Sequence, residues 1–372
     1  MTLASCGNDA EYTVKENQAF ITQTGTNANS SQKLTIGTEK VSTDLSIRLS
    51  SPTSVDCSFE FTVDPEILDE YNKLNVTDYK VLPAEFYSFS TTSIDVKTGE
   101  VLSNPVTLTV SPLSDELKNN GLKYAIPVRL KSADGKKEVL ESGGKYVILI
   151  DQVVIQPVPV LNRVNWVKAN FGNAPFDFSA WTLEFCVNMD LLGTAVGQYN
   201  NQALFSGMSS TEEIYVRFGD APIKGNIFQV KTQGTQMNSN MEFSANTWYH
   251  IAVVCTGTKL YYYVNGVLDN SMDLPGKTYR TADDGSWSMC NTSYFKANAM
   301  FSEVRFWTKA RSQQEIANNM YVCDPNSDGL QCYFKMNEGS GNIFNDATGH
   351  GGHAEVQGGE PTWVQDVRID GK

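Results

Sequence analysis

The chain of 372 residues has no stretch that approaches the roughly 18 consecutive apolar residues of a membrane-spanning helix. It is also short of positive charge: 29 Lys and Arg stand against 42 Asp and Glu, which gives a formal net charge of −13. A phosphate backbone repels such a chain, which argues against a nucleic-acid partner. An uncharged glycan is compatible with this charge, whereas an acidic glycan needs a local basic patch that the sequence does not show.

The first half of the sequence alternates between apolar and polar residues in short runs, which indicates half-buried strands. Residues 7–32 are polar and predict a tether with one strand at 18–22. Asp64 and Pro65 interrupt the alternation with an N-cap and a proline at the first helical position, which predicts a short helix. About seven short strands in about 120 residues are typical of an immunoglobulin-like sandwich.

The second half continues the strand pattern after Gln156-Pro-Val-Pro-Val160, whose two prolines predict an extended linker. Asn265-Gly266 is a two-residue hairpin turn, because both residue types tolerate positive φ. Ser312-Gln-Gln-Glu315 is a capping box that opens a short helix to Met320. We therefore divide the chain into a tether at 1–32, a first domain at 33–155, a linker at 156–160 and a second domain at 161–372.

Three ordered motifs in the last third carry a family resemblance. They are TWYHIAVVCTGTKLYYYVNG at 247–266, FSEVRFW at 301–307 and YFKMNEGSG at 333–341. In this order they resemble the laminin G-like family of concanavalin A-type lectin/glucanase sandwiches. The resemblance implies a jelly-roll sandwich, and most such domains bind a ligand without catalysing a reaction. Cys186 and Cys255 stand where the family usually has larger aromatic residues, which concerns core packing.

The first half carries a second resemblance, over roughly residues 30–155. YKVLPAEFY at 79–87, Gly99-Glu100 and YAIPVRLKS at 124–132 resemble an N-terminal domain of unknown function found on Bacteroidetes surface lipoproteins. Its members usually precede a glycan-binding or glycoside-hydrolase module in polysaccharide-utilisation systems. Together the two resemblances predict an all-β protein, with an immunoglobulin-like sandwich followed by a concanavalin A-like jelly-roll sandwich.

Leu3-Ala-Ser-Cys6 resembles a bacterial lipobox, in which the cysteine is lipidated and becomes the mature N-terminus. This resemblance predicts export, attachment to the outer membrane through lipid on Cys6 alone, and a location at the cell surface or in the periplasm. Outer-membrane uptake proteins are then possible partners.

Catalysis would require a pair of carboxylates. Related glucanases carry E-x-D-x-x-E on one strand, where alternation places the side chains on one concave face. Here Glu184 is followed by Cys186 and Met189 in the places of the second and third acids. Glu303 stands where the family has a structural acidic residue. The sequence therefore favours a protein that is not an enzyme, with a glycoside hydrolase of unfamiliar site as the alternative.

Sugar binding calls for exposed aromatic faces beside amides and carboxylates. Loops of the second domain supply these residue types, and we predict a ligand site made of Trp287, Tyr199, Asn201, Asp284 and Tyr294. For Trp287 and Tyr199 the alternative is packing at a domain interface.

Members of the wider fold often hold one structural calcium ion, and Asp283, Asp284 and Asp346 are the oxygen-rich candidates for it. Asp324-Pro-Asn-Ser-Asp-Gly329 matches half of a calcium loop, but Lys335 occupies the position that requires glutamate, so we interpret it as a turn. His350-Gly-Gly-His353 is interpreted as a glycine-rich turn as well.

Six cysteines remain beyond Cys6, and an even number in an exported protein permits disulfides. Cys186 and Cys255 lie in strand-like runs and are predicted to be buried thiols. Cys323 and Cys332 flank a turn, where both a disulfide and two free thiols are compatible with the spacing.

Our leading hypothesis is a non-catalytic, lipid-anchored protein that captures oligo- or polysaccharides for an uptake or hydrolase system. The alternatives are the glycoside hydrolase and a protein-interaction or adhesion subunit.

Overall fold

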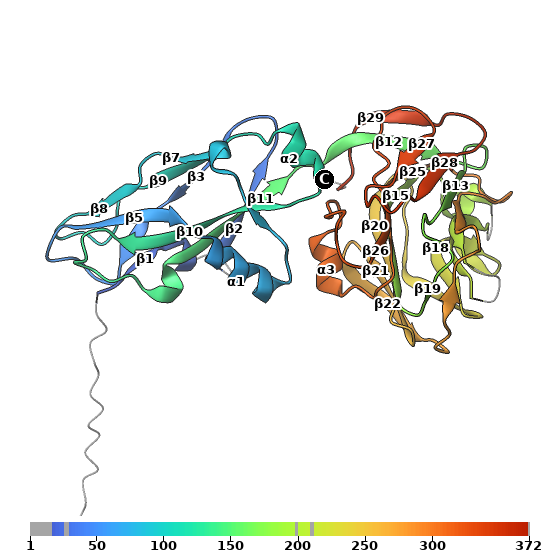
Figure 1. Ribbon diagram of the computed structural model, residues 1–372, viewed down its shortest axis with the longest axis horizontal. Coiled ribbons are helices and arrows are strands. Elements are labelled where there is room, and N and C mark those ends of the chain that lie inside the picture. The colour runs from blue at the N-terminus through green and yellow to red at the C-terminus, as the bar shows by residue number, and fades with distance from the viewer. Residues whose placement is uncertain (1–16, 26–29, 198–199, 209–211, 371–372) are drawn as a thin grey trace, which may run out of the picture. The chain divides into compact units, whose positions relative to one another are not determined.

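The computed structural model describes residues 17–25, 30–197, 200–208 and 212–370. It divides into two compact units (Figure 1): unit 1 comprises 1–114 and 123–152, and unit 2 comprises 115–122 and 153–372. Strands dominate both units, which confirms the all-β prediction. Within the described ranges, no helix has the length and apolar character needed to cross a membrane.

Unit 1 contains a six-stranded sheet, a three-stranded sheet and one short strand pair. The larger sheet is formed by β2 (Ser31–Ile36), β11 (Lys145–Gln152), β10 (Tyr124–Ser132), β5 (Cys57–Val63) and β8 (Ser93–Val96), with β6 (Lys80–Val81) beside β10. The smaller sheet is formed by β3 (Val41–Leu45), β9 (Val106–Val110) and β7 (Tyr87–Phe89), and the pair by β1 (Ala19–Ile21) and β4 (Ile47–Leu49). Two strand pairs of the larger sheet, β2–β11 and β6–β10, run parallel.

The core of unit 1 lies on both faces of the larger sheet, which is why β10 and β11 are apolar almost throughout. On one face, α1 (Pro65–Asn75) packs Ile67 and Leu68 against Ala125 and its neighbours. On the other, Phe61 of the larger sheet meets Phe89 of the smaller, with ring centroids 6.1 Å apart.

The helix start predicted at Asp64 is confirmed. The Asp64 carboxylate accepts a hydrogen bond from the Glu66 amide at 3.0 Å, and Pro65 is the first helical residue. Among the described residues, unit 1 also contains the 3₁₀ turns η1 (Thr22–Gly25), η3 (Ala84–Phe86) and η4 (Glu141–Gly143).

Both predicted boundaries of the first domain shift. Strand β1 pairs with β4, so ordered structure begins within the predicted tether, before residue 33. The predicted linker at 156–160 is instead part of β12 (Ile155–Leu161), which pairs with β29 (Thr362–Arg368) and β25 (Ala299–Trp307). Pro157 falls where the register shifts, a position at which a strand tolerates a residue without an N–H.

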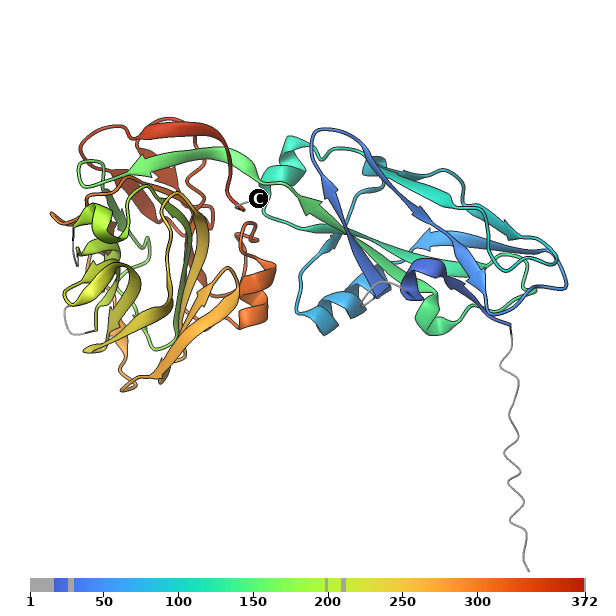
Figure 2. The ribbon, with the colours of Figure 1, turned by 180° about the vertical axis from the view of Figure 1, so that it is seen from behind.

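Unit 2 is a sandwich of two eight-stranded sheets, which face each other in Figures 1 and 2. Sheet I runs β22 (Val267–Asp273), β21 (Lys259–Val264), β20 (Trp248–Cys255), β15 (Trp181–Met189), β25, β12 and β29, with β26 (Leu330–Phe334) beside β25. Sheet II runs β19 (Thr235–Glu242), β18 (Ile223–Thr232), β17 (Ile214–Asp220), β16 (Gln202–Gly207), β24 (Ser286–Met289), β13 (Val167–Asn170), β28 (His353–Val356) and β27 (Ile343–Asn345).

The short elements of unit 2 lie around these sheets. They are α2 (Asp115–Asn119), the pair β14 (Asp177–Phe178) and β23 (Tyr279–Arg280), η5 (Gly193–Val196) and α3 (Gln313–Asn318). The capping box at Ser312 and Glu315 is confirmed, although the helix ends two residues before Met320. The turn at Asn265 and Gly266 is also confirmed, with φ of 50° and 76°.

A single hydrophobic core fills the space between sheets I and II. Its largest side chains include Trp181 and Phe306, whose rings stack with centroids 6.3 Å apart. Helix α3 lies on the outer side of sheet I, where Ile316 packs on Ala252 and Val254. Helix α3 therefore covers part of the outer face of sheet I. The second outer face of the sandwich is that of sheet II.

Candidate functional site

The outer face of sheet II is polar because its strands alternate. In β17, Ile214, Val216 and Phe218 are buried in the core, so Tyr215 and Arg217 point to the opposite side. Strand pairing aligns such outward residues across the sheet. One row crosses seven strands, namely Gln236, Lys231, Tyr215, Ser206, Ser288, Lys168 and Glu355.

Arg217 organises one half of this face. Its guanidinium donates to Gln229 Oε1 at 2.8 Å and to Asp220 at 2.5 Å, and it lies 5.3 Å from the centroid of the Tyr215 ring. Gln229 in turn donates to Asn238 Oδ1 at 2.7 Å. The side chains are thus held in place by one another, which lowers the entropy cost of binding a polar ligand.

Tyr215 links this cluster to a predicted site residue. Its hydroxyl donates to Asn201 Oδ1 at 2.9 Å. Burial raises the pKa of Tyr215, so the hydroxyl stays protonated at neutral pH. Asn201 therefore belongs to the polar face, as an acceptor fixed by a neighbouring strand.

The other half of the face holds a hollow of about 260 Å³. Its walls come from β13, β24 and β28, and its polar lining comprises Lys168, Asn170, Asp284, Ser286, His353, Glu355 and Gln357. Asp284 Oδ1 accepts a hydrogen bond from the Ser286 amide at 3.0 Å. Hydrogen bonds from Ser286 lower the pKa of Asp284, so it is a carboxylate at neutral pH. The predicted residue Asp284 thus lies in the wall of a hollow.

The expectation that Trp287 is an exposed loop residue is wrong. It lies in β24 with only 3% of its surface exposed, and its ring stacks on Phe205 with centroids 5.1 Å apart. The local sequence Ser286-Trp-Ser288 is an alternating strand pattern, in which the serines face outward and the indole faces the core. The sequence suggested a loop because polar residues surround the tryptophan.

The remaining predicted aromatic residues have different outcomes. Tyr199 lies outside the described residues. Tyr294 is 59% exposed, on the segment between β24 and β25. That segment lies beside the start of β16, because Thr292 Oγ1 donates to the Asn201 carbonyl at 3.2 Å. Asn201 and Tyr294 are therefore neighbours at one end of the sandwich.

Two of the three carboxylates predicted to hold calcium, Asp284 and Asp346, accept hydrogen bonds from backbone amides of turns. Asp346 accepts hydrogen bonds from the amides of Tyr333, Thr348 and Gly352 at 3.0–3.1 Å, so both its oxygens are engaged. Asp283 is almost fully exposed, 4.0 Å from Arg280. Among the described residues, no three His, Cys, Asp or Glu side chains gather in a metal-holding arrangement. These residues do not fit a calcium site as they stand.

The two motifs interpreted as turns are turns. Asp324 accepts a hydrogen bond from the Asn326 amide at 2.9 Å, and Gly329 has a φ of 77°. Glycines 349 and 351 have positive φ on either side of His350, and His353 begins β28.

The six cysteines of the described ranges are free and buried, which confirms the prediction for Cys186 and Cys255. Of the alternatives for Cys323 and Cys332, the structure has the free thiols. Cys323 Sγ contacts the Asp324 carbonyl at 3.6 Å, and Cys332 lies within β26.

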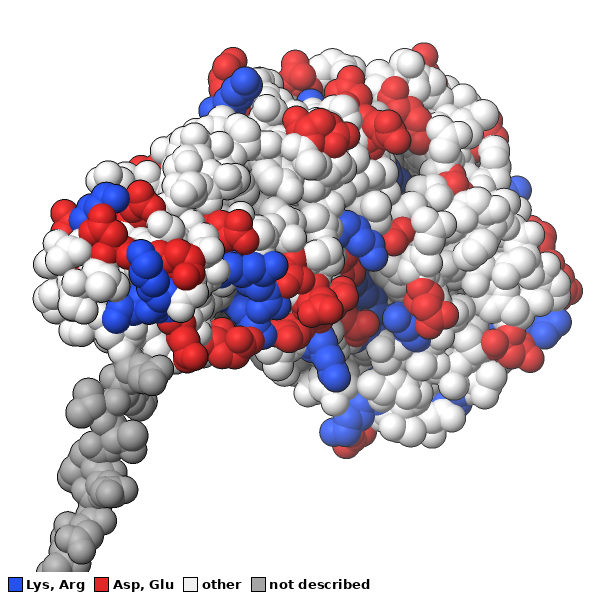
Figure 3. All heavy atoms as spheres, turned by 60° about the vertical axis from the view of Figure 1, so that its left-hand side comes forward, with Lys and Arg blue, Asp and Glu red and all other residues white. Residues whose placement is uncertain are grey.

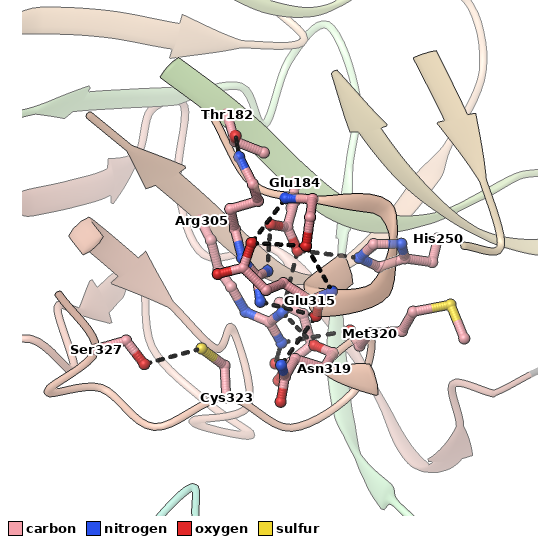
Figure 4. A network of polar contacts seen from close by, with 12 residues as sticks. Thr182, Glu184, His250, Arg305, Glu315, Asn319, Met320, Cys323 and Ser327 are labelled. Atoms are coloured by element: carbon pink, nitrogen blue, oxygen red, sulfur yellow. Dashed lines mark hydrogen bonds and ion pairs between the residues drawn. The ribbon is translucent and has the colours of Figure 1, made fainter. Parts of the chain in front are cut away.

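A second group of polar residues is buried on the outer side of sheet I, beneath α3 (Figure 4). Glu184 accepts from Arg311 at 2.5 Å and from Arg305 at 3.4 Å, and His250 Nε2 lies 3.4 Å from it. Arg305 also contacts Glu303. Each of these five side chains is at most 5% exposed.

The two arginines connect this group to the covering segment. Arg305 donates to the Asn319 carbonyl at 2.7 Å, and Arg311 donates to the Glu315 carbonyl at 2.9 Å. Sequence reasoning identified Glu303 as structural and missed both arginines. The signal that was present is charge inside strands that are otherwise apolar, as in Leu183-Glu-Phe185.

This buried group lacks the properties of a hydrolase pair. Burial by itself would raise the pKa of Glu184, but Arg311, His250 and Arg305 outweigh it and hold the pKa at about 2. A general acid must be protonated near the working pH and must reach its substrate. Glu184 is ionised and fully buried, so we assign it to holding α3 on the sheet.

Two family models match the chain. A model of an N-terminal domain family matches residues 15–137. A model of the concanavalin A-like lectin/glucanases superfamily matches residues 165–317. Among curated proteins, no match was found.

A solved structure shares the architecture. A candidate carbohydrate-binding protein from Bacteroides ovatus is 22% identical, covers 95% of this chain and 99% of its own, and has a TM-score of 0.63, which shows a common fold. An endoglycosidase from Bacteroides thetaiotaomicron, solved with a Man5GlcNAc product, is 19% identical over 36% of this chain and 31% of its own. Its TM-score of 0.31 supports no argument about function.

The order of the matched models agrees with the two units and with the motifs that the sequence carries. The chain therefore has an N-terminal domain of the first matched family, followed by a domain of the concanavalin A-like lectin/glucanases superfamily.

Proposed function

We propose that this protein binds carbohydrate without catalysing a reaction, through the outer face of sheet II. The observation that carries the proposal is the row of aligned polar side chains across seven strands of that face. The opposite outer face, by contrast, is covered by α3 and a buried charge network. The fold shared with a candidate carbohydrate-binding protein supports the same conclusion.

The chemistry of the face suits sugar hydroxyl groups. Asn238 and Asn201 offer half-buried amides whose orientation is fixed by hydrogen bonds. Arg217 and Gln229 are buried beneath them and hold the cluster in place. Amides act as donors and acceptors at once, as sugar hydroxyls do. The half-buried ring of Tyr215 adds apolar surface for sugar C–H groups.

A glycan array with the full chain tests the proposal. We expect one class of neutral polysaccharide to bind, and Tyr215→Phe to weaken that binding by about tenfold, because the hydroxyl that fixes Asn201 is lost. Tyr261→Phe on sheet I is the matched control and should bind as the wild type does. A blank array with folded protein would favour the protein-interaction alternative.

The same array tests the expectation of a structural calcium ion when it is repeated in chelator. A loss of binding, or a lower melting temperature, in chelator would support the ion. Release of reducing sugar by the pure protein would overturn the non-catalytic part of the proposal in favour of a glycoside hydrolase.

Export and lipid attachment at Cys6 are a further part of the proposal, supported by the Leu3-Ala-Ser-Cys6 motif. Cys6 lies outside the described residues. On this view the protein sits on the outer membrane and passes glycans to uptake proteins of a polysaccharide-utilisation system. Labelling with a palmitate analogue should mark the wild type and leave Cys6→Ser unmarked, and equal labelling would contradict the anchor.

A further inference from the structure

Unit 2 carries a groove at the end of the sandwich where the chain crosses between its sheets. One crossing joins β12 to β13, and another joins β24 to β25. Their residues line a groove of about 660 Å³, with Arg163 and Val164 on one side and Phe295 and Lys296 on the other. This groove is separate from the hollow that contains Asp284, with which it shares no lining residue.

Hydrogen bonds fix the walls of the groove. Asn162 Nδ2 donates to Asn298 Oδ1 at 3.1 Å, which ties the two crossings together. Asn162 Oδ1 accepts from the amides of Val164 and Asn165 at 2.9 Å, which closes a tight turn. Arg163 stands at the exposed tip of this turn.

The acidic side chain beside the groove is already engaged. Asp190 accepts from the Asn298 amide at 2.7 Å and from Asn298 Nδ2 at 2.8 Å, so its two oxygens orient the wall. Arg163 and Lys296 are exposed, and within the described ranges neither forms a salt bridge. Two cations without an acidic partner thus meet at one groove of a chain with a net charge of −13.

The loop that carries Lys296 also carries Tyr294, which is 59% exposed. An exposed ring beside amides and cations combines a stacking surface with donors for a charged group. Arginine is the side chain best suited to a carboxylate, because its planar fork matches both oxygens. The sequence showed no basic patch, since Arg163 and Lys296 come together only through the fold.

We propose that this groove binds the carboxylate of a uronate-containing saccharide through Arg163 and Lys296, with Tyr294 stacking on a sugar ring. The inference rests on the proposed carbohydrate-binding function, and it adds both a second binding site and the charge class of the ligand. Asn165 and Asn298 at the same groove offer polar groups to the sugar hydroxyls.

The test is titration of the full chain with an oligogalacturonate and with its fully methyl-esterified form, by calorimetry at low and at physiological salt. We expect the oligogalacturonate to bind at least tenfold more tightly than its ester, and this difference in affinity should decrease as the salt concentration rises. The double variant Arg163→Gln, Lys296→Gln should remove this preference. The variant Lys33→Gln, Lys259→Gln makes the same change in net charge elsewhere and should keep it.

Equal binding of acid and ester by the wild type, or an unchanged preference in the double variant, would overturn the inference. A sulfated oligosaccharide is the third ligand in the titration. If it binds more tightly than the oligogalacturonate and depends on the same two residues, the carboxylate assignment is wrong. Binding of neutral glycans sensitive to Tyr215→Phe, without any gain for acidic ones, would overturn only this inference, whereas a failure of every saccharide to bind would overturn the proposed function.

Discussion

Single residues decide the stability of unit 2 where charge is buried. Glu184 lies in β15, Arg305 in β25, and Arg311 directly before the N-cap of α3. All three are buried and each needs the others, since a buried charge without a partner costs several kcal/mol. The same burial removes these groups from solvent and from any substrate. Their effect should therefore be seen in stability measurements.

The variant Glu184→Gln should lower the free energy of unfolding by about 3–5 kcal/mol, because it leaves Arg311 buried without a counter-charge. Urea unfolding measures this change. Glu242→Gln is the control: its pair with Lys224 is more than half exposed, so the loss should stay below about 1 kcal/mol. Equal effects of the two variants would show that the buried group does not hold α3.

His250 should make the protein less stable as the pH falls. Burial lowers its pKa below the ordinary value of 6.5, with Glu184 opposing this effect. The unfolded chain therefore takes up a proton from about pH 6.5 downward while the folded chain does not, so this stability is complete above pH 6.5 and declines below it. Glu184 causes a second loss of stability, because its pKa is lower in the folded chain than in the unfolded chain. This loss begins near pH 4.5 and continues to about pH 2.

Unfolding free energies at pH 7 and pH 5 measure the histidine effect. The wild type should lose up to about 1.4 kcal/mol per pH unit from this group. His250→Gln should show a shallower decline, whatever its stability at pH 7. An identical slope in both proteins would mean that His250 does not titrate differently on unfolding.

At the scale of elements, hairpin turns set how the edge of sheet I meets α3. Two turns of the same kind join β18 to β19 and β21 to β22, with Gly234 and Gly266 at φ of 79° and 76°. Gly234 has open space around it, whereas a Cβ on Gly266 would lie 2.9 Å from Ala317 of α3. The second turn therefore needs glycine both for its backbone conformation and for the close approach of the helix.

Comparing Gly266→Ala with Gly234→Ala separates these two requirements. Both variants should have a free energy of unfolding about 1–2 kcal/mol lower, because alanine is strained in the left-handed backbone conformation. Gly266→Ala should lose about 1 kcal/mol or more in addition, because α3 must shift. Thermal unfolding measures both, and equal losses would show that the helix moves freely.

At the scale of the whole molecule, each unit carries its own core, and charged side chains of both signs intermingle on the face shown in Figure 3. All six tryptophans lie in unit 2, at positions 166, 181, 248, 287, 307 and 363. Tryptophan fluorescence therefore reports on unit 2 alone, while far-ultraviolet circular dichroism reports on both units.

We expect the two signals to give different unfolding midpoints, since two cores need not unfold together. Gly266→Ala should lower the fluorescence midpoint and leave part of the dichroism transition in place. Coincident transitions in the wild type and in the variant would show that the units unfold as one.

Local sequence signals were sufficient for much of the fold. The N-cap at Asp64, the turn at Asn265 and the capping box at Ser312 depend on residues within a few positions of one another, so the sequence predicts them directly. The strand pattern and the ordered motifs likewise predicted an all-β chain and its second domain.

Tertiary structure decided which residues meet in the candidate sites, although Asn201 and Asp284 were predicted from the sequence. Trp287 was misplaced because its polar neighbours suit the outward face of a strand as well as a loop, and only the strand pairing shows that the indole faces the core. Pro157 suggested a linker because its fit into β12 depends on β29, at the far end of the chain. Arg163 and Lys296 share a groove, and Glu184 meets Arg311, only because folding brings distant segments together. Neighbouring residues determine short-range backbone preferences, whereas burial and charge pairing depend on contacts that neighbouring residues do not specify.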